Sequence, residues 1–357
     1  MVTFYNVGTA LFTVEKIGEL YFVYDCGFSR RKDAGNIIGK AFSPGTEIEA
    51  VFISHYDRDH INGIHELLRY CKVRRLILPM LPDYLKWYYI TQRLNPQDRF
   101  FIANPIGYIR NLKLDTIVCF VEKVNIEDGL VNRPSREYRN LGNLEDGKCF
   151  HSGINLVITP KFMPEWVLIP WNIVGLNEND EKAFLKRCGL DAESRIEDLW
   201  YKKNIYKDVK RAMNNASVNA TSMTLYSGPR DVFRFPMSSC RFGCLFLGDF
   251  DAKKNLNKLK WAYWPEWTSI GCVQIPHHGS NNNFNIDLLN EEVEAVISCR
   301  LNYGKVNPKD VIKTLNSRKY KYHITDPENV CFSIEEKIIK TYQKEVCIKM
   351  SKLSCWM

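Results

Sequence analysis

The feature that most constrains the fold is a polar cluster between an apolar strand and a helix. The segment "FISHYDRDHINGIHELL", residues 52–68, places His55, Asp57, Asp59 and His60 within six positions. Side chains alternate along an extended backbone, so His55 and Asp57 project the same way, whereas Asp59 and His60 lie where the chain turns into the helix. Ionisable side chains this close are costly to hold together unless something binds between them.

Two imidazoles and two carboxylates, divided into two pairs, suit a site for two metal ions about 3.5 to 4 Å apart. The mixture of nitrogen and oxygen ligands fits Zn²⁺ best and also permits Mn²⁺ or Fe²⁺. The alternative is a polar loop in which the aspartates only cap the following helix. Four ligand-type side chains in so short a run favour the metal site.

Strands alternate with helices at both ends of the chain, which predicts a layered α+β sandwich. We expect a hairpin over 11–27, strands over 47–55 and 74–80, and a helix over 64–73. In the last third we expect strands at 222–228, 244–250, 272–275, 294–299 and 320–326, with helices at 252–259, 285–293 and 308–317. The chain is predicted to be one domain, 1–357, with irregular insertions at about 82–150 and 161–214.

The composition supports a folded protein that acts away from membranes. The 357 residues are 45% hydrophobic, which is enough for a large core, and the formal charge of +8 favours polyanionic partners slightly. No apolar run approaches the roughly 20 residues that span a bilayer. The 12 cysteines are scattered without a CxxC pair, which is typical of reduced thiols, so we expect a cytoplasmic location.

The polar cluster resembles the HxHxDH signature of metallo-β-lactamase-fold hydrolases. Its HxDxDH form is similar to that of the branch containing the metallohydrolase domain of the DNA-uptake protein ComEC. Further segments resemble that branch in order: "NATSMTLY", "LFLGD", "IPHHGS" and "ISCRLNYGKVNP". The combination of HxDxDH with PHHGS is specific, and the resemblance implies an αββα sandwich.

The resemblance also implies a set of metal ligands and catalytic residues. The implied ligands are His55, Asp57, Asp59, His60, Asp249, His277 and His278, with Asp249 bridging two ions. One of His277 and His278 is expected to complete the Asp59–His60 site, and the other to contact the substrate or to protonate the leaving group. The residues expected to take part in catalysis are Asp59, His278, Asn219 and Lys305.

Two departures from the family pattern qualify this expectation. Asn219 stands where more distant members place a metal-binding histidine, so we expect it to orient water or substrate. The histidine expected after Tyr303 and Gly304 is missing, and Lys305 or Asn307 stands there. Lys305 is expected to hold an anionic oxygen, whereas Asn307 before a proline is typical of a helix cap. The His55–Asp57 position is therefore expected to bind its metal weakly.

A pair of divalent ions activates water for hydrolysis, which predicts a metal-dependent hydrolase. We expect a phosphodiesterase, more specifically a nuclease, because of the ComEC-like branch and because basic residues cluster at 202–211 and at 309–321. One alternative is hydrolysis of a small substrate such as a cyclic nucleotide, a phosphocholine ester or a lactam. Another is a non-catalytic protein with a degenerate site that binds a protein partner in a larger assembly.

Overall fold

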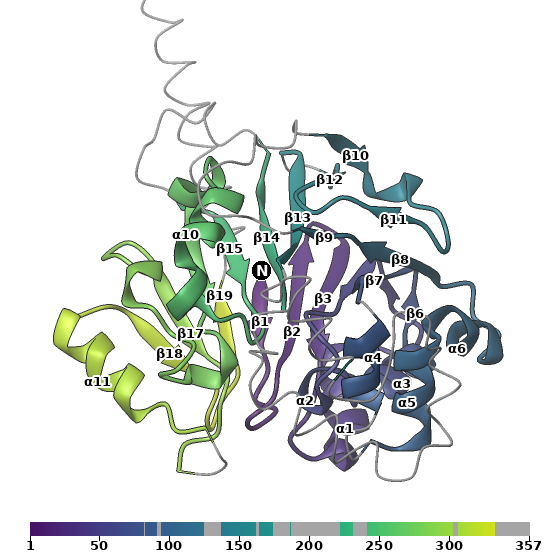
Figure 1. Cartoon of the computed structure of the whole chain (residues 1–357), viewed down its shortest axis with the longest axis horizontal. Helices are drawn as coiled ribbons and strands as arrows, with labels where there is room; N and C mark the ends of the chain where they lie inside the picture. Colours follow the sequence, from purple (N-terminus) through teal and green to yellow (C-terminus); the bar gives the residue numbers. More distant parts are fainter. Residues whose placement is uncertain are drawn as a thin grey trace, which may run out of the picture.

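Two β-sheets pack face to face, and helices cover the outer face of each (Figure 1). The computed structural model describes residues 1–81, 83–90, 94–124, 137–161, 164–173, 186, 222–230, 241–302 and 306–332. Within these residues the layers run helix, sheet, sheet, helix. The predicted αββα sandwich is confirmed.

Within the described residues, the first sheet has the strand order β11-β8-β7-β5-β3-β2-β1-β19. The predicted hairpin is its antiparallel pair β2–β3, and β3, β5, β7 and β8 run parallel. Its strands are β1 (Val2–Phe4), β2 (Phe12–Ile17), β3 (Leu20–Cys26), β5 (Ala50–Phe52), β7 (Arg75–Pro79), β8 (Ile117–Val121), β11 (Cys149–Phe150) and β19 (Val330–Phe332). A short parallel pair, β4 (Glu47–Ile48) and β6 (Lys72–Val73), lies outside it.

The second sheet has the order β10-β12-β13-β14-β15-β16-β17-β18 where the chain is described, and β9 pairs with β13. Its strands are β9 (Lys123–Val124), β10 (Tyr138–Asn140), β12 (Asn155–Ile158), β13 (Trp166–Ile173), β14 (Met223–Pro229), β15 (Gly243–Phe246), β16 (Ile270–Gln274), β17 (Glu294–Ile297) and β18 (Tyr322–Ile324). Strands β15 to β18 run parallel. Their carboxyl ends therefore meet at one edge of the sheet.

The alternation of side chains along the strands explains the layers. In β5, Ala50 and Phe52 are buried between the sheets, whereas Val51 is buried against the helices of the first sheet. Those helices are α1 (Ala34–Ala41), α2 (Arg58–Ile61), α3 (Ile64–Tyr70), α4 (Asp83–Ile90), α5 (Pro96–Ala103) and α6 (Pro105–Asn111). On the second sheet, Leu259 and Leu315 pack from α10 (Ala252–Ala262) and α11 (Lys309–Arg318).

The structure corrects two expectations about secondary structure. The segments expected to be irregular contain strands of both sheets, of which β8 and the eight-residue β13 are the longest. In β13, Pro170 removes a backbone donor and makes the sequence less typical of a strand. The predicted helix at 285–293 contains only a short 3₁₀ turn, Ile286–Leu288. There the side chains of Asn285 and Asn290 accept nearby backbone N–H groups, which compete with a helix.

Candidate metal centre

The polar motif begins three residues beyond β5, and its second half lies on the short helix α2. His55 is buried and Asp57 precedes α2, and their side chains meet with Nε2 of His55 3.4 Å from Oδ2 of Asp57. Asp59 and His60 lie within α2. The main-chain carbonyl of Asp59 packs so closely on Gly27 that a side-chain carbon there would lie 1.6 Å from its oxygen. Glycine at 27 is therefore required for the motif to dock on β3.

Asp25, near the end of β3, holds the motif in place through hydrogen bonds to Ser54 and His60. Its Oδ1 accepts the backbone N–H of Ser54 at 2.7 Å, and its Oδ2 accepts the Ser54 hydroxyl at 2.6 Å and lies 2.7 Å from Nδ1 of His60. Asp25 is fully buried and has a positive φ of 56°. A carboxylate on Nδ1 fixes the ring of His60 so that Nε2 faces the opposite direction.

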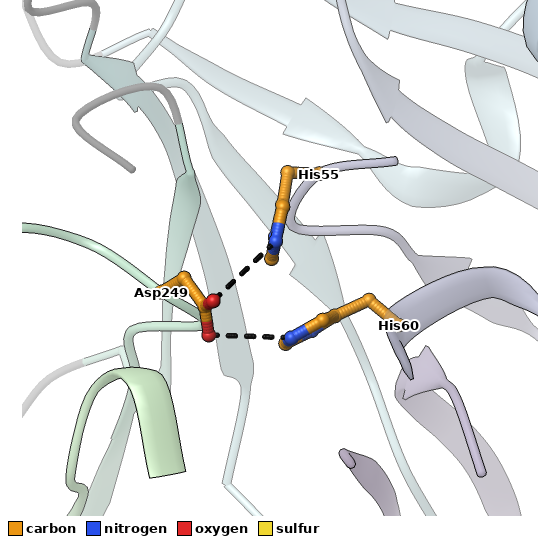
Figure 2. A group of neighbouring side chains, drawn as sticks. All are labelled: His55, His60 and Asp249. Atoms are coloured by element: carbon orange, nitrogen blue, oxygen red, sulfur yellow. Dashed lines mark ion pairs between the residues drawn. The ribbon is translucent and has the colours of Figure 1, made fainter. Parts of the chain in front are cut away.

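Asp249 brings the second half of the chain to the motif. It follows β15, and its carboxylate lies between two histidines of the first motif (Figure 2). Oδ1 of Asp249 is 3.2 Å from Nε2 of His60, and Oδ2 is 3.7 Å from Nε2 of His55. The preceding Gly248 has a positive φ of 54°, and a side-chain carbon there would lie 2.6 Å from the Ser54 side chain. Glycine thus permits the close approach that places Asp249.

The two histidines after β16 face different oxygens of Asp249. Nε2 of His278 is 3.1 Å from Oδ2 of Asp59 and 4.0 Å from Oδ1 of Asp249. Nε2 of His277 is 3.5 Å from Oδ2 of Asp249. His278 thus meets the Asp59–His60 pair, whereas His277 meets the oxygen that His55 faces.

The turn that carries these histidines is conformationally unusual. His277 and His278 both have positive φ, 49° and 54°, a conformation that costs most side chains roughly 1 to 3 kcal/mol and that gathers at functional sites. The following Gly279 lies against α11, because a side-chain carbon there would lie 2.9 Å from Cβ of Pro308. The turn therefore abuts the first residues of that helix.

Two groups of side chains can each hold a cation. One is His55, His60 and Asp249, and the other is Asp59, His60 and His278; in each, the ligand atoms lie within 4.8 Å of one another. We call Asp59, His60 and His278 the inner side of Asp249, and His55, Asp57 and His277 its outer side. His60 belongs to both groups, which the simple division of the motif into two pairs does not anticipate.

The supporting bonds explain how the remaining histidine nitrogens are used. Nδ1 of His278 donates to the carbonyl of Ser298 at 2.9 Å. Nδ1 of His55 lies 2.9 Å from the hydroxyl of Ser54 and 3.3 Å from that of Ser222, and Nδ1 of His277 lies 3.0 Å from Oδ1 of Asn283. All four Nε2 atoms consequently point into the cluster.

Charge pairing dominates the electrostatics of the inner side. Burial by itself raises the pKa of Asp249, but the surrounding imidazoles, His60 first, outweigh it and hold that pKa well below its usual value. Burial also raises the pKa of Asp59, but the hydrogen bond from His278 and the charge of His60 lower it to about 2. Both carboxylates are therefore ionised and available as ligands.

The same charge pairing raises the pKa values of the inner histidines, His60 and His278. Burial by itself lowers the pKa of His60, but the carboxylates of Asp249 and Asp25 outweigh it and raise that pKa well above its usual value. Burial likewise lowers the pKa of His278, whereas its hydrogen bond to Asp59 and the charge of Asp249 raise it. The carboxylates thus create a strongly negative local potential, which favours the binding of a cation.

Three buried atoms test whether metal ions fit this cluster. Nε2 of His55, Nε2 of His60 and Oδ1 of Asp249 are buried, and none has a hydrogen-bond partner in the described part of the chain. Buried polar atoms normally have partners, so three of them facing one another indicate a missing common ligand. Imidazole nitrogen and carboxylate oxygen are ligands that Zn²⁺ and Mn²⁺ accept. The residues present fit a metal.

Some of the residues predicted to belong to the site lie outside the part of the chain that the structure describes. Asn219 and Lys305 are outside the described residues, as are Tyr303, Gly304 and the basic segment 202–211. Oδ1 of Asn307 accepts the backbone N–H of Lys309, the first residue of α11, but the N-cap of this helix is Pro308 and not Asn307. The supporting roles of Ser54, Ser222 and Asn283 were not expected. Ser54 directly precedes His55 in the motif and Ser222 stands within the "NATS" segment, but neither pattern indicates a hydrogen bond to a histidine nitrogen.

Comparison with known proteins finds a family model that matches part of the chain. Residues 10–119 match the model of the Metallo-beta-lactamase superfamily. This segment contains the whole HxDxDH motif and extends into the region of about 82–150 that was predicted to be an insertion. No curated protein matches the chain.

One solved structure that aligns with the chain is human tRNase Z, short form (ELAC1). The identity is 9%, the TM-score is 0.37, and the alignment covers 93% of this chain and 99% of that one. A similarity this distant carries no argument about activity. None of the described helices is both long enough and apolar enough to cross a membrane. The described residues have the metallo-β-lactamase fold, and residues 10–119 carry the sequence pattern of the Metallo-beta-lactamase superfamily.

Proposed function

We propose that the protein is a metal-dependent phosphodiesterase that cleaves nucleic acid strands. The observation that carries this proposal is the convergence of unsatisfied buried ligand atoms from His55, His60 and Asp249. Divalent ions held there would activate water and stabilise the negative charge that develops on phosphoryl oxygens. The fold alone does not choose among phosphodiesters, lactams and thioesters, so the choice depends on the surroundings of the site.

The two oxygens of Asp249 support a site for two ions. Oδ1 faces the inner side and Oδ2 faces the outer side, which is the arrangement of a bridging carboxylate. On this proposal Asp59, His60 and His278 hold the inner ion, and His55 and Asp57 hold the outer one. His278 lies beside Asp59 and His277 beside the outer oxygen of Asp249, which supports His278 as the histidine that completes the Asp59–His60 site.

The surface beside the site supports a polyanionic substrate. Helix α11 begins against Gly279, next to His278, and exposes a series of basic residues with one acidic residue among them, Asp310. The exposed basic residues of this helix and the turn after it are Lys309, Lys313, Arg318, Lys319 and Lys321. Such a surface attracts a phosphate backbone and makes binding weaker as salt increases. Asn219 and Lys305 keep their proposed roles near substrate.

Turnover of defined substrates tests the proposal. The purified protein, loaded with Mn²⁺ or Zn²⁺, is expected to cleave single-stranded DNA or RNA and a chromogenic phosphodiester, and to lose this activity on substitution His60→Ala. A matched control is His151→Ala, which removes an exposed histidine that pairs with Glu122 outside the cluster. Intact DNA, RNA and chromogenic ester in the presence of bound metal would refute the proposal.

The alternatives give different results in the same experiments. A small-molecule hydrolase would cleave a cyclic nucleotide, a phosphocholine ester or a lactam at a rate that salt hardly changes. A degenerate binding protein would contain less than one equivalent of metal per chain by elemental analysis.

A further inference from the structure

A cavity lies near the candidate metal centre. It has a volume of about 550 Å³ and is formed by three separate segments of the chain: residues 6–8 before β2, residues 28–40 of the loop after β3 and of α1, and Arg300 with Asp326. None of its lining residues is a predicted metal ligand. It therefore needs its own explanation.

Short hydrogen-bonded connections join this cavity to the inner side of the cluster. The carbonyl of Ser298 accepts Nδ1 of His278, and the Ser298 hydroxyl donates to the carbonyl of Ala10 at 2.8 Å. Two residues further on, the backbone N–H of Arg300 donates to Oγ1 of Thr9 at 3.4 Å. Because an extended chain advances at most about 3.6 Å per residue, the Cα atoms of Ser298 and Arg300 lie within about 7 Å of each other.

The charges in the cavity favour an anion. Its lining contains the cations Arg30, Lys40 and Arg300 and the carboxylates Asp33 and Asp326. Both carboxylates are engaged by the protein itself: Oδ2 of Asp33 accepts Nε of Arg30 at 2.7 Å, and Oδ2 of Asp326 accepts the backbone N–H of Leu301 at 2.9 Å.

Lys40 is a further cation of the lining, and neither of these two contacts involves it. It is exposed, and within the described part of the chain no ion pair or hydrogen bond is formed by its ammonium group. Nearby, Asn36 adds an exposed amide to the lining. The only aromatic ring in the lining, Phe28, is buried, so it offers no face on which a base could stack. The lining thus provides contacts for a phosphate and not for a base.

We infer that this cavity binds a phosphate group of the substrate strand that flanks the phosphodiester cut at the metal centre. This inference rests on the proposed function and narrows it: the substrate is an oligonucleotide, recognised by its backbone with little base preference. Contacts to phosphate position a nucleic acid without reading its sequence.

The test compares two substrates in Lys40 variants. For Lys40→Ala, kcat/KM on a single-stranded oligonucleotide is expected to fall about tenfold, the usual effect of losing one charged hydrogen bond. Turnover of bis(p-nitrophenyl) phosphate, which has no flanking phosphate, should stay unchanged. Lys40→Glu should lower oligonucleotide cleavage further, and Lys40→Arg should restore it. The matched control is Lys32→Ala, which removes an exposed lysine of the same segment that does not line the cavity.

A binding measurement separates the inference from the proposed function. The metal-free protein is titrated with a fluorescent oligonucleotide at several salt concentrations, and Lys40→Ala should lower the slope of log K against log[salt] by about 0.7, the value for one phosphate contact on a single strand. Equal slopes for wild type, Lys40→Ala and Lys32→Ala would overturn the inference even if the protein cleaves DNA. A smaller slope in Lys40→Ala alone would support phosphate binding in this cavity even if the wild type cleaves neither substrate, a result that would refute the proposed function and the position of that phosphate beside a cleaved bond.

Discussion

The inner and outer sides of Asp249 differ in how their histidines are held. On the inner side, Nδ1 of His60 meets the carboxylate of Asp25 and Nδ1 of His278 meets a main-chain carbonyl. On the outer side, Nδ1 of His55 meets two hydroxyls and Nδ1 of His277 meets an amide oxygen. Each set of partners orients its imidazole rings, but only on the inner side is one of these Nδ1 partners a carboxylate, that of Asp25.

This difference predicts that the ion on the inner side is bound more tightly than the ion on the outer side. A carboxylate behind a ligating histidine increases the basicity of the ring and fixes its orientation, whereas a hydroxyl does so less strongly. We therefore expect strong binding on the inner side and weak binding on the outer side, which agrees with the expectation from the missing closing histidine.

The largest effect is expected for Asp249→Asn, because one carboxylate faces both sides. The amide is a poor ligand, so both ions should be lost and turnover should fall more than about a hundredfold, beyond the effect of residues that only orient a ligand. Elemental analysis and phosphodiesterase assays measure this. The matched control, Asp251→Asn, changes the buried capping residue of α10 two positions away and should keep both metals. Retention of one full equivalent in Asp249→Asn would show that the two sides are independent.

The next effect tests the carboxylate behind His60. Asp25→Asn should weaken binding of the inner ion about 10- to 100-fold and should leave the outer ion nearly unchanged. Competition with a chromogenic chelator reports both affinities. If the two affinities fall together, Asp25 supports the whole cluster, and the distinction between the sides is wrong.

Removal of metal should itself occur in two steps. With increasing chelator, the outer ion is expected to leave first and the inner ion only at higher concentration, because its ligands are better supported. The amount of metal remaining after each step can be measured on the desalted protein. Release of both ions in one cooperative step would contradict the expected order.

A smaller effect is expected on the outer side from Ser222→Ala. The Ser222 hydroxyl lies 3.3 Å from Nδ1 of His55 and accepts the backbone N–H of Asp249, so its loss should weaken the outer ion by less than about tenfold. The same chelator competition measures it. An effect as large as that of Asp25→Asn would mean that hydroxyl and carboxylate partners are equivalent here.

The smallest expected effect concerns Asp98, a buried carboxyl group that does not belong to the metal cluster. Burial raises the pKa of Asp98 to about 6, and the nearby Arg31 offsets this only in part. Since the folded protein holds this proton more tightly than the unfolded chain, its contribution to stability is present below pH 4 and is lost as the pH rises to about 6. Asp98→Asn should remove that loss, so its melting temperature relative to wild type should be higher at pH 7 than at pH 4.5. An equal difference at both pH values would contradict this.

Much of the fold could be predicted from the sequence because local patterns determine it. The strand before His55, the hairpin at 11–27 and the helix–strand alternation of the last third each follow from apolar periodicity. The strand β13 could not be predicted, because its pairing with β14 overrides the unfavourable Pro170. The helix expected at 285–293 failed because asparagine side chains form bonds with the local backbone.

The candidate site was predictable as a set of ligand types but not as a geometry. The spacing of the motif indicated His55, Asp57, Asp59 and His60 as candidate ligands, and the family resemblance added Asp249. Which of His277 and His278 joins Asp59 depends on the positive φ of both residues, a backbone detail that no spacing encodes. The hydroxyls behind His55 come from both halves of the chain, so only the folded structure could identify them.

The contact of Gly279 with Pro308 has a mechanical consequence. No room remains for a side-chain carbon at position 279 beside Pro308, the N-cap residue of α11, so the histidine turn and the start of this helix are in direct contact. A larger residue at position 279 is therefore expected to push the start of the basic helix away from the turn and to displace the inner ligand His278.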